Sequence, residues 1–446
     1  MLELFANRTY RRLFLAQIIA LLGTGLLTVA LGLLAWDLAG AQAGSVLGTA
    51  LVIKMIAYIA VAPIASVIAE TMPRGLLLIT LDIIRAGIAL MLPFVDQVWQ
   101  IYVLIFLLQS SSAAFTPAFQ ATIPDILPDE RDYTRALSLS RLAYDLETLI
   151  SPIIAAALLS FAGYQLLFAG TGAGFLLSAL LITFAALPAI ATRSDAANFF
   201  DRTTRGIRYY LATPRLRGLL ALNLAAASGG AMVIVNTVVY VQSVFQGSES
   251  EVAIALAMFG AGSIVSALLL PWVLETVPDR IAMTTGAIII FVCLLLTSAV
   301  SASWQHGWEA LLILWFAVGF GYSLVLTPSG RLLRRSCHKA DRPKLFAAQF
   351  ALSHACWLVT YAVAGWLGAY AGLGLTSLTL AGLAGTGILI ALVVWPHRDP
   401  ASVVHTHTNL QLGHPHIEDA RRNGEAFVHE HEFVIDEFHK AWPSKQ

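Results

Sequence analysis

Long apolar runs separated by short polar connections dominate the chain. Each run has about twenty residues or more, enough for a helix to span the ~30 Å hydrocarbon layer of a bilayer. The runs lack the alternation of apolar and polar residues that barrel strands show, so the pattern predicts helices. The twelve predicted spans lie near residues 13–36, 45–66, 76–96, 99–121, 136–159, 164–187, 217–242, 252–274, 282–302, 308–329, 346–369 and 375–395.

Composition agrees with a multi-pass membrane protein. Hydrophobic residues make up 58% of the 446 positions and charged residues 12%, and the mean hydropathy is +0.74, whereas soluble domains carry about 25% charged residues. The first run is longer than the ~7–15 residues of a signal-peptide core, so we expect it to remain as a helix. Three widely spaced cysteines predict neither a disulfide framework nor a paired zinc motif, and the net charge of 0 does not indicate a nucleic-acid partner.

Basic residues fall on one side of the predicted membrane. The connections on the side away from the N-terminus contain no Lys or Arg. They lie around residues 37–44, 97–98, 160–163, 243–251, 303–307 and 370–374. Because Lys and Arg concentrate in cytoplasmic loops, we predict that both termini are cytoplasmic.

The spans divide into two similar sets of six. Glu70-Thr-Met-Pro73 follows the second span and Glu275-Thr-Val-Pro278 follows the eighth; Thr116-Pro117 in the fourth matches Thr327-Pro328 in the tenth. This pattern predicts parallel repeats with a solute site between them. We therefore expect an N-terminal six-helix bundle over residues 1–187, a basic cytoplasmic linker over 188–216, a C-terminal six-helix bundle over 217–396 and a His-rich cytoplasmic tail over 397–446.

These features resemble the major facilitator superfamily, over roughly residues 8–396. That family carries Gly-x-x-x-Asp-Arg-x-Gly-Arg between helices two and three. The corresponding stretch here keeps the acid as Glu70 and the last base as Arg74, but replaces both glycines and the first arginine. With Glu275 in the second half, these residues form the predicted gating loop. Three segments resemble an exporter branch related to macrolide and siderophore efflux pumps: Asp82-Ile-Ile-Arg85-Ala, residues 117–124, and Thr213-Pro-Arg-Leu-Arg217.

The resemblance implies alternating access driven by the proton gradient in the bacterial inner membrane. The family's first, fourth, seventh and tenth helices line a central cavity. By this resemblance the cavity candidates are Gln17, Thr24, Thr28, Gln109, Ser112, Thr116, Gln120, Asn223, Asn236, Tyr240 and Tyr322. Such side chains can equally be hydrogen-bond partners between helices.

Ionisable side chains within the predicted spans are candidates for proton coupling, because each costs ~2.5–3.5 kcal/mol or more near mid-bilayer. The candidates are Lys54, Asp82, Arg85, Arg141, Asp145 and Glu147, together with Asp37 at the outer end of the first span, which water alone would satisfy. Asp82 and Arg85 share a helix face, as do Arg141 and Asp145, so both are predicted structural ion pairs. Glu147 has no basic residue one turn away and is therefore the preferred proton carrier.

Potential metal ligands gather in the eleventh span and the tail. His354 and Cys356 are two residues apart on a helix, so a shared metal needs ligands from other helices. The tail holds three His-x-His pairs: His405 and His407, His414 and His416, His429 and His431. In an extended segment each pair points to one side, and imidazole suits Ni, Cu, Co and Zn. The alternative is a solvated, disordered tail. The stretch from Phe433 to Trp442 predicts a short helix docked on the cytoplasmic face.

The sequence thus predicts an all-α membrane transporter. The resemblance implies that it uses protons and neither a cofactor nor ATP, and the absence of a Gly-x-x-x-x-Gly-Lys-Ser/Thr run agrees. The tail and the stretch from Ser353 to Trp357 resemble nickel- and cobalt-resistance exporters, which makes a divalent transition metal the leading substrate. A drug or other amphipathic organic molecule is the alternative substrate, and a transporter-like membrane sensor is the alternative function. No nucleophile–base constellation appears, so an enzyme is not predicted.

Overall fold

The apolar runs form helices, in which backbone amide and carbonyl groups find their partners without water. The computed structural model describes residues 2–39, 43–69, 72–161, 163–187, 199–247, 249–299, 306–397, 402–407, 421–423, 426–436, 439 and 442. In this part of the chain, eleven helices are long and apolar enough to cross a membrane. The 30-residue helix α5, which carries Arg141, Asp145 and Glu147, is more polar than these eleven and brings the number of long helices in the bundle to twelve.

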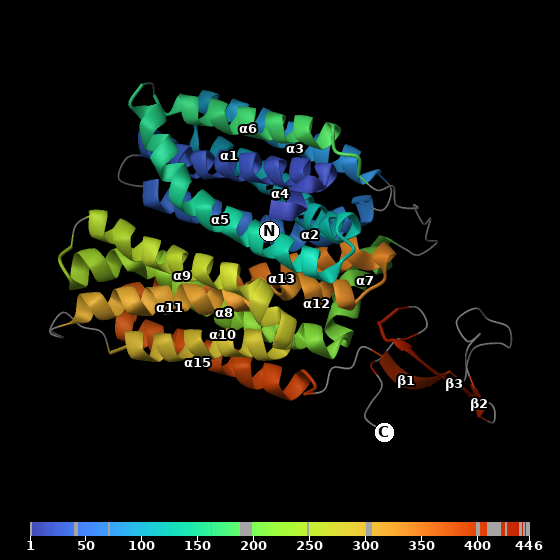
Figure 1. Cartoon of the computed structure of the whole chain (residues 1–446). Coiled ribbons are helices and arrows are strands. Elements are labelled where there is room, and N and C mark those ends of the chain that lie inside the picture. The colour runs from blue at the N-terminus through green and yellow to red at the C-terminus, as the bar shows by residue number, and fades with distance from the viewer. Residues whose placement is uncertain are drawn as a thin grey trace.

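The first six long helices form one half of the molecule, the upper half in Figure 1. They are α1 (Arg8–Ala39), α2 (Ala43–Ala69), α3 (Arg74–Met91), α4 (Val98–Ile126), α5 (Glu130–Leu159) and α6 (Gln165–Thr183). Short 3-10 helices, η1 (Leu2–Ala6) and η3 (Leu92–Phe94), precede α1 and follow α3. Helix α6 packs against α1 and α3, while α4 packs against α2 and α3, so this half has its own core.

The second half, lower in Figure 1, is built from six more long helices. They are α8 (Pro214–Val238), α9 (Glu249–Thr276), α10 (Asp279–Thr297), α11 (Gly307–Leu326), α13 (Arg342–Ala362) and α15 (Leu373–Val394). Short pieces extend or connect them: η4 (Val239–Val244), α12 (Ser329–Arg335), η5 (Lys339–Asp341), η6 (Val363–Leu367) and α14 (Gly368–Ala371). Each predicted span corresponds to one long helix, and the twelve-helix prediction is confirmed.

The third helix of each half begins at the same structural position. Pro73 precedes α3 and Pro278 precedes α10, both with extended ψ angles, of 131° and 144°. The first residue of α3 is Arg74, which pairs with Asp125 at the end of α4. The first residue of α10 is Asp279, whose carboxylate lies 3.5 Å from Arg331 and 3.7 Å from Arg335 of α12. The two halves therefore share an ion pair at this position, with the charges exchanged.

The connection between the halves contains a helix that the sequence did not predict, α7 (Phe199–Ala212). It packs against α2 and α13 at the end of the bundle that we call the linker end (Figure 1). The contact is close: a Cβ added at Gly206 would lie 2.4 Å from the carbonyl oxygen of Lys344. The hydroxyl of Tyr210 donates a hydrogen bond to Gln349 of α13. Helix α7 is thus anchored to both halves.

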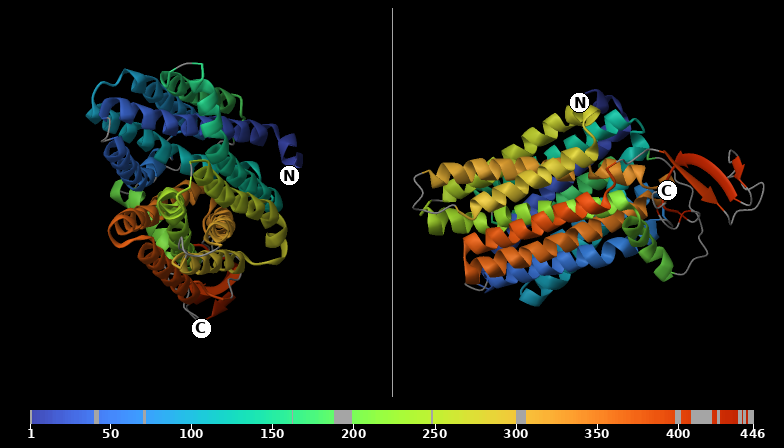
Figure 2. Two further views of the ribbon diagram at one scale, coloured as in Figure 1. Left: turned by 90° about the vertical axis from the view of Figure 1, so that its left-hand side faces the viewer. Right: turned by 90° about the horizontal axis from the view of Figure 1, so that it is seen from below.

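The tail forms a small antiparallel sheet that projects beyond the linker end (Figure 2). Its strands are β1 (Ser402–His407), β2 (Arg421–Asn423) and β3 (Ala426–Glu432), in the order β1-β3-β2. The backbone register sets His405 opposite His429. These strands were not predicted, whereas the part that crosses the membrane is all-α as expected.

The described residues after β3, at 433–436, 439 and 442, dock on the linker end and are not helical; the rest of the predicted short helix lies outside the described residues. Phe433 is buried, and its carbonyl oxygen accepts a hydrogen bond from Arg215 of α8 at 3.3 Å. Asp436 lies 3.1 Å from the ring of His338 and 2.9 Å from that of His439. Burial raises the pKa of Asp436, but these hydrogen bonds outweigh burial and hold it well below its usual range. The tail is therefore held to the second half by an ionised carboxylate.

Glycines allow α9 and α11 to pack backbone against backbone. A Cβ added at Gly319 would lie 1.9 Å from the carbonyl oxygen of Phe259, and one added at Gly262 would lie 1.9 Å from that of Phe316. Small residues permit such close helix contacts in membranes, where van der Waals packing replaces the hydrophobic effect as the force between helices.

We predict that Gly319→Ala destabilises the second half by about 1–3 kcal/mol or more, because the added methyl group meets backbone that cannot rotate away. Thermal unfolding of the purified protein measures the effect. Gly382→Ala in α15 is the matched control, since a Cβ there meets nothing within 4 Å. Equal melting temperatures for the two variants would contradict the close packing of α9 on α11.

Candidate functional site

A buried carboxylate joins the two halves at the linker end. Asp125 closes α4, and its side chain has no exposed surface. It pairs with Arg74 of its own half and with Arg342 at the start of α13 in the other half. The ammonium group of Lys339 lies 3.9 Å away. Removing one partner of a buried pair leaves an uncompensated charge that costs ~3–5 kcal/mol, so this contact favours the closed linker end.

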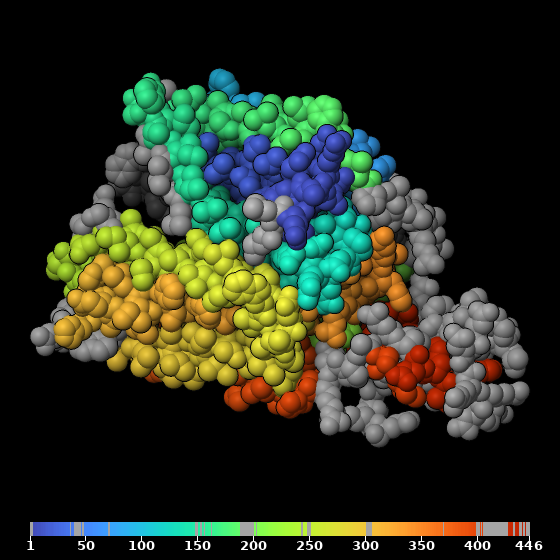
Figure 3. Space-filling view, in the orientation of Figure 1, coloured from blue at the N-terminus to red at the C-terminus, as the bar shows by residue number. Residues whose placement is uncertain are grey.

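Further contacts across the halves surround Asp125. Arg331 of α12 lies 2.7 Å from Glu130 of α5, and the more exposed Arg131 lies 3.2 Å from Glu275 of α9. Arg334 donates to the carbonyl oxygen of Pro128. Among the described residues, the ion pairs that cross between the halves all lie at this end, whereas Figure 3 shows a hollow between the halves at the opposite end. The structure is closed at the linker end.

A polar cluster lies midway along the helices where the halves meet. The central cluster consists of Lys54 and Tyr58 of α2, Gln109 of α4, Glu147 of α5 and His354 of α13. The hydroxyl of Tyr58 donates to Gln109 at 2.8 Å, and its ring centre lies 4.7 Å from that of His354. The positive charge of Lys54 acts on both Glu147 and His354. The cluster thus brings three ionisable groups together from three helices.

The space for Glu147 is provided by a glycine of α1. A Cβ added at Gly25 would lie 2.8 Å from a carboxylate oxygen of Glu147 and 2.0 Å from the hydroxyl of Ser151. Glu147 is half-buried, and the charge that faces it comes from α2 rather than from its own helix. Its environment is therefore set by α1, α2 and α5 together.

The ion pair of Arg141 and Asp145 on α5 faces the other half. Arg141 pairs with Asp145 and donates to the hydroxyl of Ser263 on α9 at 3.1 Å. Its guanidinium carbon lies 4.7 Å from the ring centre of Tyr322 on α11. The ring of Tyr322 in turn meets Trp357 of α13 at 6.1 Å. This ion pair is a contact between the halves as well as within α5.

Asp82 and Arg85 lie inside the first half. They pair with each other on α3 and are 0% and 5% exposed. The guanidinium carbon of Arg85 lies 4.0 Å from the ring centre of Phe115 and 4.5 Å from that of Phe175. Aromatic faces on both sides favour a structural role for this pair.

Several predicted cavity residues form hydrogen bonds between or within helices. Gln17 accepts from Ser140 at 3.2 Å, Asn236 donates to the carbonyl of Ala364 at 3.2 Å, and Tyr240 donates to that of Thr297 at 3.2 Å. The hydroxyls of Thr24 and Thr28 bond to their own helix. Ser112 and Asn223 are buried, Thr116 and Gln120 are half-buried, and Asp37 is exposed at the far end, where it accepts from Tyr164.

Of the predicted metal ligands, His354 and Cys356 on α13 do not come together, whereas His405 and His429 occupy facing positions in the tail sheet. The ring of His354 lies 2.7 Å from the carbonyl of Phe350, whereas the sulfur of Cys356 lies 4.0 Å from that of Leu220 on α8, so the two face different helices. Within the described ranges, no group of three or more His, Cys, Asp or Glu side chains could hold a metal. His405, His407, His429 and His431 lie in strands; His414, His416 and the predicted gating residue Glu70 lie outside the described residues.

Sequence reasoning missed the residues that close the linker end. Asp125 follows Pro124 at the end of an apolar span, and that position could have identified it as an interfacial charge. Tyr58 gave no signal, because a tyrosine in an apolar helix is unremarkable. No basic residue lies one turn from Glu147 on α5, whereas the charge of Lys54 acts on it from α2.

Comparison with known proteins gives a family and a fold. A family model described as Major Facilitator Superfamily matches residues 13–246 and 218–429. The human organic anion transporter TETRAN is structurally similar, with 13% identity, a TM-score of 0.74 and coverage of 86% of this chain and 99% of that one. A bacterial homologue of the iron transporter ferroportin, in an outward-facing state, has 14% identity and a TM-score of 0.73, covering 86% of this chain and 98% of that one. The Escherichia coli fucose:proton symporter has 14% identity and a TM-score of 0.66, covering 87% of this chain and 98% of that one. Among curated proteins, no sequence matches this chain.

We predict that Gly330→Val opens the linker end. A Cβ at Gly330 of α12 would lie 2.7 Å from the hydroxyl of Tyr133 and 2.8 Å from Leu137, both on α5 of the other half. Overpacking costs about 1–3 kcal/mol, so the open population should rise about tenfold. Burial raises the pKa of the Cys337 thiol to about 12, which keeps it unreactive while the end is closed.

The rate of maleimide labelling of Cys337 measures this opening, in a background with Cys293→Ser and Cys356→Ser. Gly382→Val is the control, because a Cβ at Gly382 meets no atom within 4 Å. Unchanged labelling in a folded Gly330→Val protein would show that this contact does not hold the halves together.

Proposed function

The chain belongs to the Major Facilitator Superfamily, and we propose that it is a proton-coupled secondary transporter that exports a small amphipathic organic molecule. The observation that carries this proposal is the central cluster, where the charge of Lys54 acts on Glu147 and Lys54 lies 5.5 Å from the ring centre of Tyr58, which packs on His354 of the other half. Transporters of this kind bind solute near the bilayer midplane, between their repeats.

The basic residues support a bacterial inner-membrane orientation with the linker end in the cytoplasm. Both ends of the chain lie on this side: Glu3 is 3.5 Å from Arg135 at the start of α5, and the tail docks beside Arg215. With the linker end closed, solute and protons would reach the central cluster from outside. Opening would require Asp125 and Arg342 to separate.

Glu147 is the proposed proton carrier. A carboxylate that is half-buried, held beside one lysine and next to the meeting surface of the halves, can exchange a proton with each side in turn. A polar group of the solute and a proton would compete for this carboxylate, and such competition is what antiport requires. The rings of Tyr58, Phe350 and Trp357 would contact the apolar part of the solute.

Export of a divalent transition metal such as nickel or cobalt is the second candidate. The backbone register that sets His405 opposite His429 favours it, because it brings one histidine from each of two His-x-His pairs to facing positions on neighbouring strands. His354 and Cys356, which face different helices, do not add a metal site in the membrane. The structural neighbours include an iron-transporter homologue as well as an organic anion transporter, so they do not favour either substrate.

We predict that Glu147→Gln abolishes transport driven by a pH gradient in proteoliposomes, because the amide cannot carry a proton. Solute binding should persist, measured as protection against thermal unfolding. Glu309→Gln is the matched control, since Glu309 is an exposed carboxylate at the start of α11. Full pH-driven transport by the Glu147→Gln protein would eliminate this residue as the carrier.

We predict that an expressing strain gains tolerance to amphipathic antibiotics and dyes, and that Glu147→Gln removes this tolerance. Growth across a panel that includes nickel and cobalt measures it. If the strain gains tolerance only to the metals, the substrate is a metal ion and not an organic molecule. In that case His405→Ala/His429→Ala, compared with the exposed His306→Ala, tests whether the tail captures the metal.

A further inference from the structure

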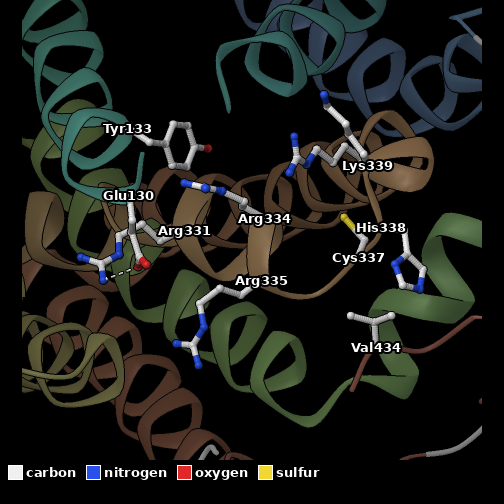
Figure 4. Close-up of a pocket in the computed structure, with 10 residues that line it drawn as sticks. Glu130, Tyr133, Arg331, Arg334, Arg335, Cys337, His338, Lys339 and Val434 are labelled. Atoms are coloured by element: carbon white, nitrogen blue, oxygen red, sulfur yellow. Dashed lines mark hydrogen bonds and ion pairs between the residues drawn. The ribbon is translucent and has the colours of Figure 1, made fainter. Parts of the chain in front are cut away.

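A strongly basic cavity of about 380 Å³ opens at the linker end (Figure 4). Five cationic side chains and one carboxylate line it: Arg331, Arg334, Arg335, Lys339 and Arg342, with Glu130. Figure 4 shows Glu130 and the labelled cations Arg331, Arg334, Arg335 and Lys339 around the opening, with Tyr133 on one side and His338 and Val434 on another. None of these residues belongs to the central cluster, so the cavity is separate from the proposed solute site.

The carboxylates near the cavity do not balance its positive charge. Besides Glu130, Asp125 reaches Lys339 and Arg342, and Asp279 reaches Arg331 and Arg335. Five cations therefore meet three carboxylates, an excess of two. Asp125 also pairs with Arg74, which increases the excess. The nearby Asp436 carboxylate is bonded to His338 and His439.

Among the described residues, Arg334 is the one of the five cations without a carboxylate at ion-pair distance. It donates to the carbonyl oxygen of Pro128, and its guanidinium carbon lies 5.4 Å from the ring centre of Tyr133. Among the described residues, its Nη1 atom and the Tyr133 hydroxyl are buried without a hydrogen-bond partner. A buried polar group left unsatisfied costs ~1–3 kcal/mol, and more when it is charged. An anion in the cavity would offset this cost and the repulsion between the cations.

We propose that this cavity binds a phosphate group and that the bound phosphate holds the two halves together. Several guanidinium forks around one space match the oxygens of a phosphate, which accepts paired hydrogen bonds from arginine. A cavity of about 380 Å³ also has room for groups attached to the phosphate. The excess positive charge disfavours a metal cation or a cationic solute.

The cavity is lined by residues of both halves, so a bound ligand would favour the conformation in which the halves are in contact at the linker end. Glu130 and Tyr133 come from α5 in the first half, whereas Arg334 and Arg335 come from α12 in the second. Val434 of the docked tail completes the lining. The cavity therefore exists in this form only while the linker end is closed and the tail is docked. A ligand that binds one of two states shifts the population toward that state.

Two sources can supply the phosphate: the headgroup of an anionic phospholipid or a soluble phosphate compound. The test uses the full-length protein in two settings. In detergent, inorganic phosphate is compared with chloride at equal ionic strength. In nanodiscs, phosphatidylcholine with added phosphatidate is compared with phosphatidylcholine alone. The readouts are the melting temperature and the labelling rate of Cys337, which we expect phosphate to slow about fivefold or more.

Arg334→Gln/Arg335→Gln should remove the response, and Arg334→Lys should retain part of it, because the charge remains without the planar fork. The matched control is Arg8→Gln/Arg217→Gln, two exposed arginines at helix starts outside the cavity. A response to phosphatidate alone identifies a lipid headgroup, and a response to inorganic phosphate identifies a soluble source. Both outcomes support the site.

The contact between halves is tested by spin labels near the linker end, at Asp132→Cys on α5, whose side chain is 43% exposed, and at the exposed Thr276→Cys on α9, with the native cysteines replaced by serine. Phosphate should narrow the distribution of distances between the two spin labels and increase the share of short distances. The proposal is overturned if neither phosphate source changes any readout. It is also overturned if wild type and a folded Arg334→Gln/Arg335→Gln protein respond equally.

Discussion

The closed arrangement depends on a buried carboxylate, which needs a cationic partner both when the halves are in contact and when they separate. Asp125 has no exposed side-chain surface, and it has one partner in its own half, Arg74, and another across the interface, Arg342. When the halves separate, Arg74 moves with Asp125, so the carboxylate is never left without a counter-charge. The cost of opening is then the loss of one partner rather than the exposure of a bare buried charge. A pairing of this kind allows two stable states at one interface.

The second half repeats this device with the charges exchanged. Asp279 at the start of α10 anchors Arg331 and Arg335 within its own half, and Arg331 also reaches across to Glu130. Apart from the more exposed pair of Arg131 with Glu275, the first half therefore presents carboxylates to the interface and the second presents cations. Two copies of an ancestral half with identical charges would repel each other here, so the exchange of sign makes the two surfaces complementary. It also leaves the excess of cations that the basic cavity gathers.

The sequence predicts what the bilayer dictates and misses what distant helices decide together. Twelve runs of about twenty apolar residues leave one solution for the backbone, and the proline before α3 and its match before α10 identify the repeat. Helical periodicity relates a residue only to neighbours one turn away, so the electrostatic influence of Lys54 on Glu147 could not be predicted from it. Helix α7 is strongly amphipathic, but it was missed because only long apolar runs were assigned as helices and its 14 residues are largely polar. The tail strands are short and polar, so they carry a weak periodic signal.

Two continuous helices join the centre of the molecule to the linker end. Helix α5 carries Glu130 in its first turn and Glu147 further along, and α13 begins with Arg342 and carries His354 beyond it. A helix transmits displacement along its axis because its backbone hydrogen bonds resist local bending. A shift of α5 or α13 caused by charge or contacts at the central cluster therefore moves a residue that closes the linker end. No separate relay is required, since the same two helices hold both the proposed proton carrier and the ion pairs that must break.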